Sequence, residues 1–336
     1  GSFFGTSYFG TARPDASNFT EATTWALDNF GEYLVACSSS DGKIYQWELD
    51  TATVAAVLSN APVNNLSIIV TAERFLFALG AGGNPRLVQW SDREDNNTWT
   101  AAATNEAGQI ELQTAGQIMS SINVRGQTLI LTDQDAHSAT YEGPPYVYNL
   151  ERVGQSCGVI SRKALASVDA GAFWMGQEGF FSYAGGTVQE VTCEVADYVF
   201  GDINKSQSSL VHAVAMAQHG EIWWFYPSGS SNECDRYVAL DYKEGHWVFG
   251  QIDRTCGVER GVFKHPLWTD ALGNLWEQEV GLNYEGATIF AESGPISMGA
   301  GDQVMCATSL IPDENTLGNV SATFKTRFYP NGPEQS

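Results

Sequence analysis

Short apolar runs alternate with glycine-centred turns along most of the chain. In residues 165–183 an apolar run ends at the Gly-Gln-Glu-Gly turn of residues 176–179, and an aromatic run begins immediately. This arrangement is typical of a β-hairpin. Residues 212–249 contain four such runs, and we therefore expect one four-stranded antiparallel sheet there.

Paired runs of this kind recur six times, and in five of the repeats the second run ends on an aromatic residue. Between Trp47 and Trp276 the average period is about 46 residues, which matches propeller blades and not helical solenoids. The spacings are uneven, and the repeats lack WD40 and kelch residues. We predict an all-β protein, a β-propeller of about six blades, with one blade more or fewer left open.

The ends of the chain differ from the repeats. Residues 1–20 carry five irregularly spaced Phe or Tyr rings, and we expect an N-terminal extended arm that packs through them. The propeller is predicted over residues 21–292, and a C-terminal β segment over 293–336. Residues 319–329 alternate apolar and polar positions, which predicts a strand that either closes the ring or begins a further β domain.

Two inserts interrupt the repeats. Residues 92–99 are predicted to form a charged surface loop. Residues 194–203 are predicted to form a short helix with Thr192 as its N-cap. One face of that helix is expected to hold Val195, Tyr198, Val199 and Ile203.

Charge and cysteine content exclude several classes of protein. The net charge of −22 opposes a surface that grips nucleic-acid phosphates. The six cysteines lack zinc-ligand spacing, so we expect buried, reduced thiols; they are Cys37, Cys157, Cys193, Cys234, Cys256 and Cys306. No apolar run approaches the roughly 20 residues that cross a bilayer, and we expect no membrane span.

No constellation of residues predicts catalysis. None of the histidines (His137, His212, His219, His246 and His265) lies in a nucleophile elbow. The glycine-rich residues 80–83 lack the Lys-Ser/Thr of a phosphate loop, and we predict a hairpin loop there. Acidic groups occur at Asp92/Glu94/Asp95, Asp133/Asp135 and Glu277/Glu279, in turns or after strands where solvated carboxylates are ordinary. We predict no catalytic, cofactor or metal site, and we expect the chain not to be an enzyme.

The order of several motifs is more specific than any one of them. They are WALDNFGEYLVA at 25–36, GKIYQW at 42–47, WSDRED at 90–95, GQTLI at 126–130, WMGQEGFF at 174–181, DYVF at 197–200, EIWWFYP at 221–227 and DRYV at 235–238. Together they resemble a family of tailed-phage virion proteins that form the short-tail nozzle or head-closure hub, similar in role to packaged-DNA stabilisation proteins. The similarity covers most of residues 1–330.

The resemblance implies a propeller-bearing subunit repeated as a ring, a hexamer, around the tail channel. It implies a structural virion protein, assembled in the host cytoplasm, that lines or closes the DNA channel, retains packaged DNA and passes it on ejection. Expected partners are copies of itself, other tail or portal-adaptor proteins, and DNA that is not bound specifically. The alternative is a carbohydrate-binding or glycoside-hydrolysing propeller, since such enzymes place two carboxylates and stacking tryptophans around a sugar.

Overall fold

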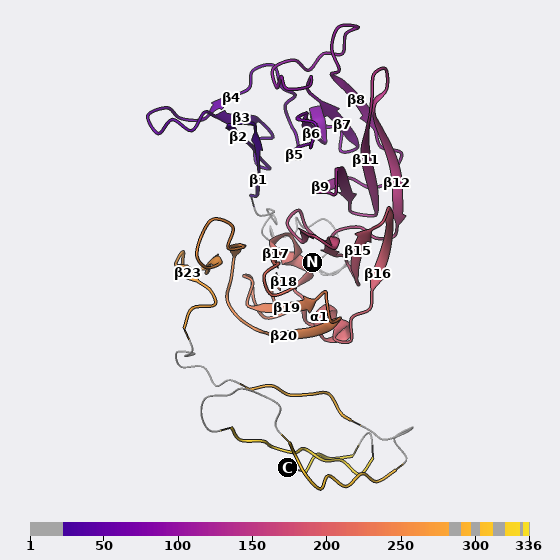
Figure 1. Cartoon of the computed structure of the whole chain (residues 1–336), viewed down its shortest axis with the longest axis vertical. Helices are drawn as coiled ribbons and strands as arrows, with labels where there is room; N and C mark the ends of the chain where they lie inside the picture. The colour runs from indigo at the N-terminus through magenta and orange to yellow at the C-terminus, as the bar shows by residue number, and fades with distance from the viewer. Residues whose placement is uncertain (1–22, 282–289, 297–302, 312–319, 330–331, 336) are drawn as a thin grey trace, which may run out of the picture. The chain divides into compact units, whose positions relative to one another are not determined.

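The computed structural model describes residues 23–281, 290–296, 303–311, 320–329 and 332–335. The chain divides into two compact units, Gly1–Val280 and Gly281–Ser336. The first unit is a six-bladed β-propeller, which confirms the predicted fold class (Figure 1). The sequence had placed the end of the propeller after residue 292, and the predicted arm of residues 1–20 lies outside the described residues.

The blades are antiparallel sheets of consecutive strands. Blade 1 contains β1 (Trp25–Phe30), β2 (Tyr33–Ser38), β3 (Ile44–Trp47) and β4 (Ala56–Val57); blade 2 contains β5 (Ser67–Val70), β6 (Leu76–Leu79), β7 (Leu87–Trp90) and β8 (Gly108–Glu111); blade 3 contains β9 (Ile118–Val124), β10 (Gln127–Thr132), β11 (Asp135–Gly143) and β12 (Val147–Gln155). Blade 4 contains β13 (Leu165–Val168), β14 (Gly171–Met175), β15 (Phe180–Ala184) and β16 (Thr187–Val191); blade 5 contains β17 (His212–Met216), β18 (Glu221–Tyr226), β19 (Arg236–Asp241) and β20 (His246–Gln251); blade 6 contains only β21 (Cys256–Val258), β22 (Leu267–Thr269) and β23 (Leu275–Glu277).

Each blade runs from an inner strand to an outer strand. The first strands of consecutive blades lie side by side, β1 against β5, β5 against β9, β9 against β13, β13 against β17, and β17 against β21. Every connection between blades therefore leads from the outer strand of one blade to the inner strand of the next. The sheet predicted over residues 212–249 is confirmed as blade 5.

Apolar side chains fill the spaces between neighbouring blades. Clusters of buried residues join blade 1 to blade 2, blade 2 to blade 3, blades 3, 4 and 5 together, and blade 5 to blade 6. Tyr148 illustrates this packing, because its ring meets Phe75, Phe77 and Trp90 edge-on at centroid distances of 5.2, 4.8 and 5.5 Å. Middle strands are covered on both faces, so β6 is buried at all four positions and its sequence, LFAL, is apolar throughout.

The short helix forms with a different start, and three of the four residues predicted on its apolar face, Val195, Val199 and Ile203, lie in or against the core. It is α1 (Ala196–Asp202), and Val195 occupies the N-cap position without a side-chain hydrogen bond. Thr192 is not the cap; its carbonyl oxygen accepts a hydrogen bond from the Trp247 indole. Val199 is buried as predicted, whereas Tyr198 is exposed and lies against Phe249 at 4.4 Å. Two short 3-10 helices are η1 (Ala81–Gly83) and η2 (Lys205–Leu210).

The predicted strand over residues 319–329 is wrong for its described part. Residues 320–329 contain one isolated bridge, between Thr326 and Gln335, and no ladder. Alternating apolar positions are not sufficient for a strand, because its backbone groups also need a pairing partner. In the described part of the chain, no helix is long and apolar enough to span a membrane.

All six cysteines are free thiols, but they are not all buried. Cys37, Cys157 and Cys234 are buried, and burial raises the pKa of the Cys37 thiol to about 12. Cys256 and Cys306 are exposed, which corrects the prediction of six buried thiols. The apolar neighbours of Cys306 suggested burial, but residues 303–311 are exposed throughout.

Candidate functional site

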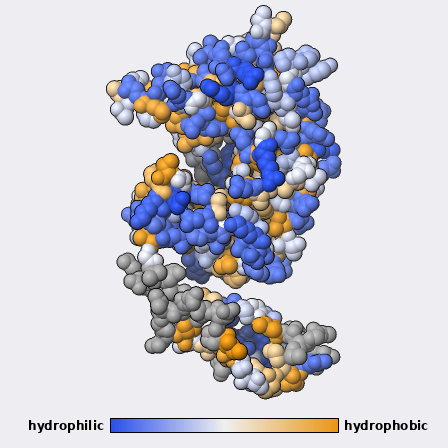
Figure 2. Space-filling model, in the orientation of Figure 1, coloured by the Kyte–Doolittle hydropathy of each residue, from blue (hydrophilic) through white to orange (hydrophobic). Residues whose placement is uncertain are grey.

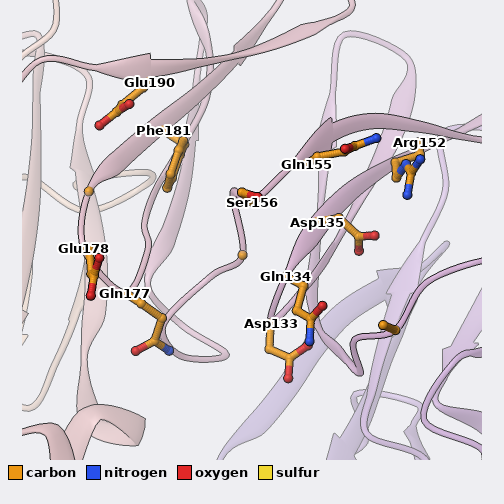
Figure 3. A pocket seen from close by; sticks show the side chains of 13 residues that line it. Asp133, Gln134, Asp135, Arg152, Gln155, Ser156, Gln177, Glu178, Phe181 and Glu190 are labelled. Atoms are coloured by element: carbon orange, nitrogen blue, oxygen red, sulfur yellow. The ribbon is translucent and has the colours of Figure 1, made fainter.

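A pocket of about 700 Å³ opens where blades 3 and 4 meet (Figure 3). Its walls come from the turn between β10 and β11, the end of β12, the turn between β14 and β15, and strand β16. The side chains that line it are mostly polar: Asp133, Gln134, Asp135, Arg152, Gln155, Ser156, Gln177, Glu178, Phe181 and Glu190. Figure 3 shows Glu178 and Glu190 on one side and Asp133 and Gln134 on the other.

Two close backbone approaches fix the shape of this pocket. At Gly158 a Cβ atom would lie 2.0 Å from the carbonyl oxygen of Asp133, so only glycine allows the chain to pass the β10–β11 turn. The β14–β15 turn is closed by a hydrogen bond of 2.8 Å from the Gly176 amide to the Gly179 carbonyl oxygen. The predicted hairpin turn at residues 176–179 is thus confirmed, and it presents Gln177 and Glu178 to solvent.

The two acidic residues predicted together, Asp133 and Asp135, have different environments. Asp133 is half-buried, and its Oδ1 accepts a hydrogen bond of 2.9 Å from the Gln117 amide. Asp135 is buried, and its Oδ1 accepts hydrogen bonds from the Thr114 and Thr132 hydroxyls. Asp135 therefore holds the base of the pocket together and has little capacity left for a ligand.

His137 lies beside Asp135, with Nε2 at 3.2 Å from Oδ1. Burial lowers the pKa of His137, an effect that the Asp135 carboxylate opposes. A neutral imidazole packed inside a blade in this way is a structural group. The two side chains meet because positions 135 and 137 lie on the same face of β11.

The pocket suits hydrogen bonding to a polar, uncharged or cationic ligand. The amides of Gln134, Gln155 and Gln177 offer donors and acceptors, and the carboxylates of Glu178 and Glu190 offer acceptors. Phe181 is the one aromatic residue in the lining, and Trp174 stacks behind it at 6.0 Å. Within the described residues, no group of three His, Cys, Asp or Glu side chains could hold a metal ion.

A second pocket, of about 670 Å³, lies between blade 1 and the loop that follows β7. Its charged side chains are four carboxylates and one guanidinium, namely Glu32, Glu48, Glu94, Asp95 and Arg74. The first pocket has the same balance, with four carboxylates and Arg152. Carboxylates thus gather at two separate places on the propeller, and no tryptophan lines either of them.

The other acidic groups predicted from the sequence do not converge. In the loop predicted as a charged surface, Asp95 accepts a hydrogen bond of 2.7 Å from Thr98, and Glu94 lies 4.0 Å from Arg74. The end of this loop is anchored, because Trp99 is buried and donates to the Asn96 carbonyl oxygen at 2.7 Å. Glu277 and Glu279 are exposed at and after β23.

Residues 80–83 connect β6 to β7, which confirms the predicted hairpin loop. Most tryptophans serve the core, as their positions at strand ends suggested. Of the ten tryptophans, five are buried, namely Trp90, Trp99, Trp174, Trp224 and Trp268, and two more, Trp223 and Trp247, are half-buried against the core clusters.

One buried histidine lies near a thiol. His212 Nδ1 is 4.0 Å from Cys234 Sγ, and its ring stacks on Phe225 at 5.0 Å. Burial lowers the pKa of His212 to about 4 and raises the pKa of Cys234. Both shifts oppose the thiolate–imidazolium pair that nucleophilic catalysis needs. The sequence did not predict this contact, because the two residues are 22 positions apart.

Most residues of the first pocket were not predicted as a site. Arg152, Gln155, Ser156 and Glu190 carry no motif, and they become neighbours only when blades 3 and 4 pack together. A polar turn such as residues 176–179 looks the same in sequence whether or not it borders a pocket.

The comparisons with known proteins concern the architecture. No family model and no curated protein sequence matches the chain. Among solved structures it is similar to a streptogramin B lyase (8% identity, TM-score 0.47, 77% of this chain and 83% of the other). It is also similar to a protein described as a 6-phosphogluconolactonase from Bacteroides uniformis (11% identity, TM-score 0.48, 76% of this chain and 83% of the other). A virginiamycin B lyase from Staphylococcus aureus is similar over 78% of this chain and 85% of the other, at 8% identity and a TM-score of 0.47.

These comparisons correct one expectation. The prediction that the chain is not an enzyme does not stand, because the similar structures include two described as lyases and one described as a 6-phosphogluconolactonase. The absence of a recognisable catalytic motif does not exclude catalysis on this architecture. At 8% and 11% identity the likeness concerns the fold alone, and it assigns no reaction to this chain.

Proposed function

We propose that this chain is a structural virion protein of a bacteriophage short tail, where it forms part of the nozzle or the head-to-tail hub. The observation that carries the proposal is the ordered set of motifs between Trp25 and Val238, which resembles that family. The propeller that the resemblance implies is the fold of the first unit. In this role, copies of the chain form a ring, a hexamer, that lines or closes the channel for packaged DNA.

The charge distribution supports this role on physical grounds. A channel that retains DNA and then releases it must not bind phosphate groups tightly. The net charge is −22, and in each of the two surface pockets carboxylates outnumber guanidinium groups by four to one. Such a surface repels a polyanion and lowers friction during ejection.

Genetic depletion of the protein during phage growth tests the proposal. We expect the chain among the peptides of purified virions, and we expect particles made without it to lose their packaged DNA. Cryo-electron microscopy of complete virions should place propellers of this size in a ring at the short tail. Virions that lack the protein and yet keep their DNA and infect normally would refute the proposal.

A second candidate, a carbohydrate-binding propeller, is favoured by the chemistry of the pocket between blades 3 and 4. Three glutamine amides, several carboxylates and Phe181 are the groups with which proteins bind sugars. A glycan array with the purified protein tests it, using Gln177→Ala as the variant and Asn97→Ala in the second pocket as the control. Binding that Gln177→Ala abolishes and Asn97→Ala preserves would support this candidate, and an array without any bound glycan would remove it.

A further inference from the structure

The connection between blades 3 and 4 carries an unusual charge for this chain. Residues 152–168 contain Arg152, Arg162 and Lys163 and no Asp or Glu, although Asp and Glu outnumber Lys and Arg by 39 to 17 in the whole sequence. Arg162 and Lys163 are also the only two Lys or Arg residues that are adjacent in the sequence. Figure 2 shows a mostly hydrophilic surface on the propeller, and acidic residues supply most of the charge of the chain. The adjacent cations are therefore an exception that needs a physical reason.

Hydrogen bonds to two blades hold the backbone of this connection in place. The Val159 amide donates to the Thr132 carbonyl oxygen in blade 3 at 3.0 Å, and the Ile160 amide donates to the Met175 carbonyl oxygen in blade 4 at 2.9 Å. Residues 157–161 are buried, whereas the first of the two adjacent cations is half-buried and the second is exposed. The connection thus presents these two charged side chains from a fixed backbone.

Arg162 reaches the centre of the ring, which inner strands such as β5 and β9 surround (Figure 1). Its Nη1 donates a hydrogen bond of 3.0 Å to the carbonyl oxygen of Leu66, which directly precedes β5 in blade 2. Arg162 itself precedes β13 in blade 4, and blade 3 lies between these two blades around the ring. The guanidinium group therefore passes the inner edge of blade 3. Within the described residues, only one of its five N–H donors has an acceptor, so the others are available to a ligand.

Lys163 extends from the same place toward blade 6. Its backbone pairs with His212 at the start of β17 in blade 5. Its ammonium group lies near enough to the thiol of Cys256, which begins β21 in blade 6, for the two groups to interact electrostatically. The side chain is exposed, and yet burial lowers the pKa of its ammonium group, an effect that the Cys256 thiolate opposes. Protein therefore surrounds Lys163 on most sides while water still reaches it, as expected at the centre of a propeller.

No carboxylate neutralises this pair. In the part of the chain that the structure describes, neither Arg162 nor Lys163 forms an ion pair. By contrast, Arg74, Arg86 and Arg236 each lie within 4.0 Å of a carboxylate oxygen. A charge that is partly removed from water without a counter-ion costs free energy, and an anionic ligand offsets that cost.

We propose that Arg162 and Lys163 form a binding site for a small anion of the phosphate class at the centre of the propeller. The planar guanidinium group of Arg162 can donate two parallel hydrogen bonds to phosphate oxygens, and the ammonium group of Lys163 adds a compact positive charge. This site does not depend on the tail function and would hold for any role of the propeller.

The charge of the whole chain limits the size of the ligand. A duplex of DNA would bring many phosphates into the field of a chain whose net charge is −22. A small anion brings only a few charges, and all of them can lie close to the two cations. The site should therefore select a small phosphate over a nucleic acid.

Isothermal titration calorimetry of the full chain with inorganic phosphate tests the site. We expect saturable binding, which Lys163→Gln should weaken by about tenfold or more because a charge-assisted hydrogen bond is lost. Arg162→Lys should also weaken it, since lysine lacks the paired donors, and Lys163→Arg should largely preserve it. Lys43→Gln removes the same charge from an exposed turn as a matched control and should bind phosphate like the wild type. The ammonium group of Lys163 has no hydrogen-bond partner among the described residues, so its loss should leave the fold intact.

The thiol of Cys256 reports where the anion binds. Phosphate should slow the alkylation of Cys256 by iodoacetamide and leave the exposed Cys306 unchanged, as measured by mass spectrometry of the labelled peptides. A short DNA duplex should neither protect Cys256 nor displace phosphate. The absence of saturable phosphate binding, or equal weakening by Lys163→Gln and Lys43→Gln, would overturn the proposal. Tighter binding of the duplex than of phosphate would also overturn it, because the ligand would then be a nucleic acid.

Discussion

Two buried tryptophans offer a test of how neighbouring blades are held together. Trp174 on β14 and Trp224 on β18 are both fully buried. The indole Nε1 of Trp174 donates to the Cys157 carbonyl oxygen at 2.7 Å, and that of Trp224 donates to the Ala164 carbonyl oxygen at 3.1 Å. Cys157 and Ala164 both lie in the connection between blades 3 and 4, and Ala164 directly precedes β13. The Trp174 indole therefore ties blade 4 to this connection, and the Trp224 indole ties blade 5 to it.

The two acceptors differ in their remaining partners. The Ala164 carbonyl oxygen also accepts a hydrogen bond of 3.0 Å from the Met175 amide. The Cys157 carbonyl oxygen has no second donor among the described residues, and Cys157 is 1% exposed. Replacing Trp174 by phenylalanine therefore leaves a buried carbonyl group without a partner, whereas replacing Trp224 does not.

The expected losses follow from this difference. Removing part of an indole ring from a packed core costs about 1–2 kcal/mol at either position. An unsatisfied buried carbonyl group adds about 1–3 kcal/mol. We therefore expect Trp224→Phe to lower the free energy of unfolding by about 1–2 kcal/mol and Trp174→Phe by about 2–5 kcal/mol.

Urea unfolding followed by circular dichroism measures both losses, provided that the m-value is unchanged. The exposed Trp25→Phe serves as a control and should have little effect. Equal losses for the two buried positions, or a larger loss for Trp224→Phe, would refute the reasoning.

Three further predictions concern single residues. Burial lowers the pKa of His212 from 6.5 to about 4, so the stability that the neutral imidazole contributes is complete above pH 6.5 and is lost as the pH falls toward 4. In urea titrations at pH 7 and pH 4, His212→Gln should reduce the acid-induced loss in the free energy of unfolding by up to about 3 kcal/mol, and an imidazole already charged at pH 7 would contradict this. Gly158→Ala should lower the melting temperature, because its Cβ would lie 2.0 Å from a backbone atom. The Cβ of Gly201→Ala in α1 would meet nothing within 4 Å, and this variant should raise the free energy of unfolding by up to about 1 kcal/mol. Equal melting temperatures for the two variants would contradict this. The exposed Cys256 should react with a thiol reagent in the folded protein and Cys37 only after unfolding, and mass spectrometry of the labelled peptides would expose the opposite order.

The sequence predicted the propeller because the middle strands of a blade are easy to recognise. Strands such as β6 and β18 are apolar or aromatic over their length, since both faces are covered by other blades. Outer strands were mostly missed, with β20 of blade 5 as an exception. β4 has two residues, and β16 (TVQEV) is mostly exposed, so neither carries a clear apolar pattern.

The candidate site was far less predictable than the fold. Asp133 and Asp135 were recognised as an acidic pair, but their separate roles depend on Gln117 and Thr114, which lie in other segments. The pocket itself forms where two blades meet, and no local sequence pattern indicates which residues come together there. The misplaced helix cap at Thr192 has the same origin, because the Thr192 carbonyl accepts a bond from a tryptophan 55 residues away.

The construction of each blade from consecutive strands determines the order in which the propeller can fold. Contacts within a blade are local, and proteins rich in local contacts fold quickly. A blade can therefore form as soon as its last strand has left the ribosome, at a synthesis rate of about 5–20 residues per second. Longer-range contacts come later; the hydrogen bond from Arg162 to the Leu66 carbonyl oxygen joins residues 96 positions apart and must wait for blade 4. During synthesis, each folded blade is therefore available to cover one apolar face of the blade that follows it.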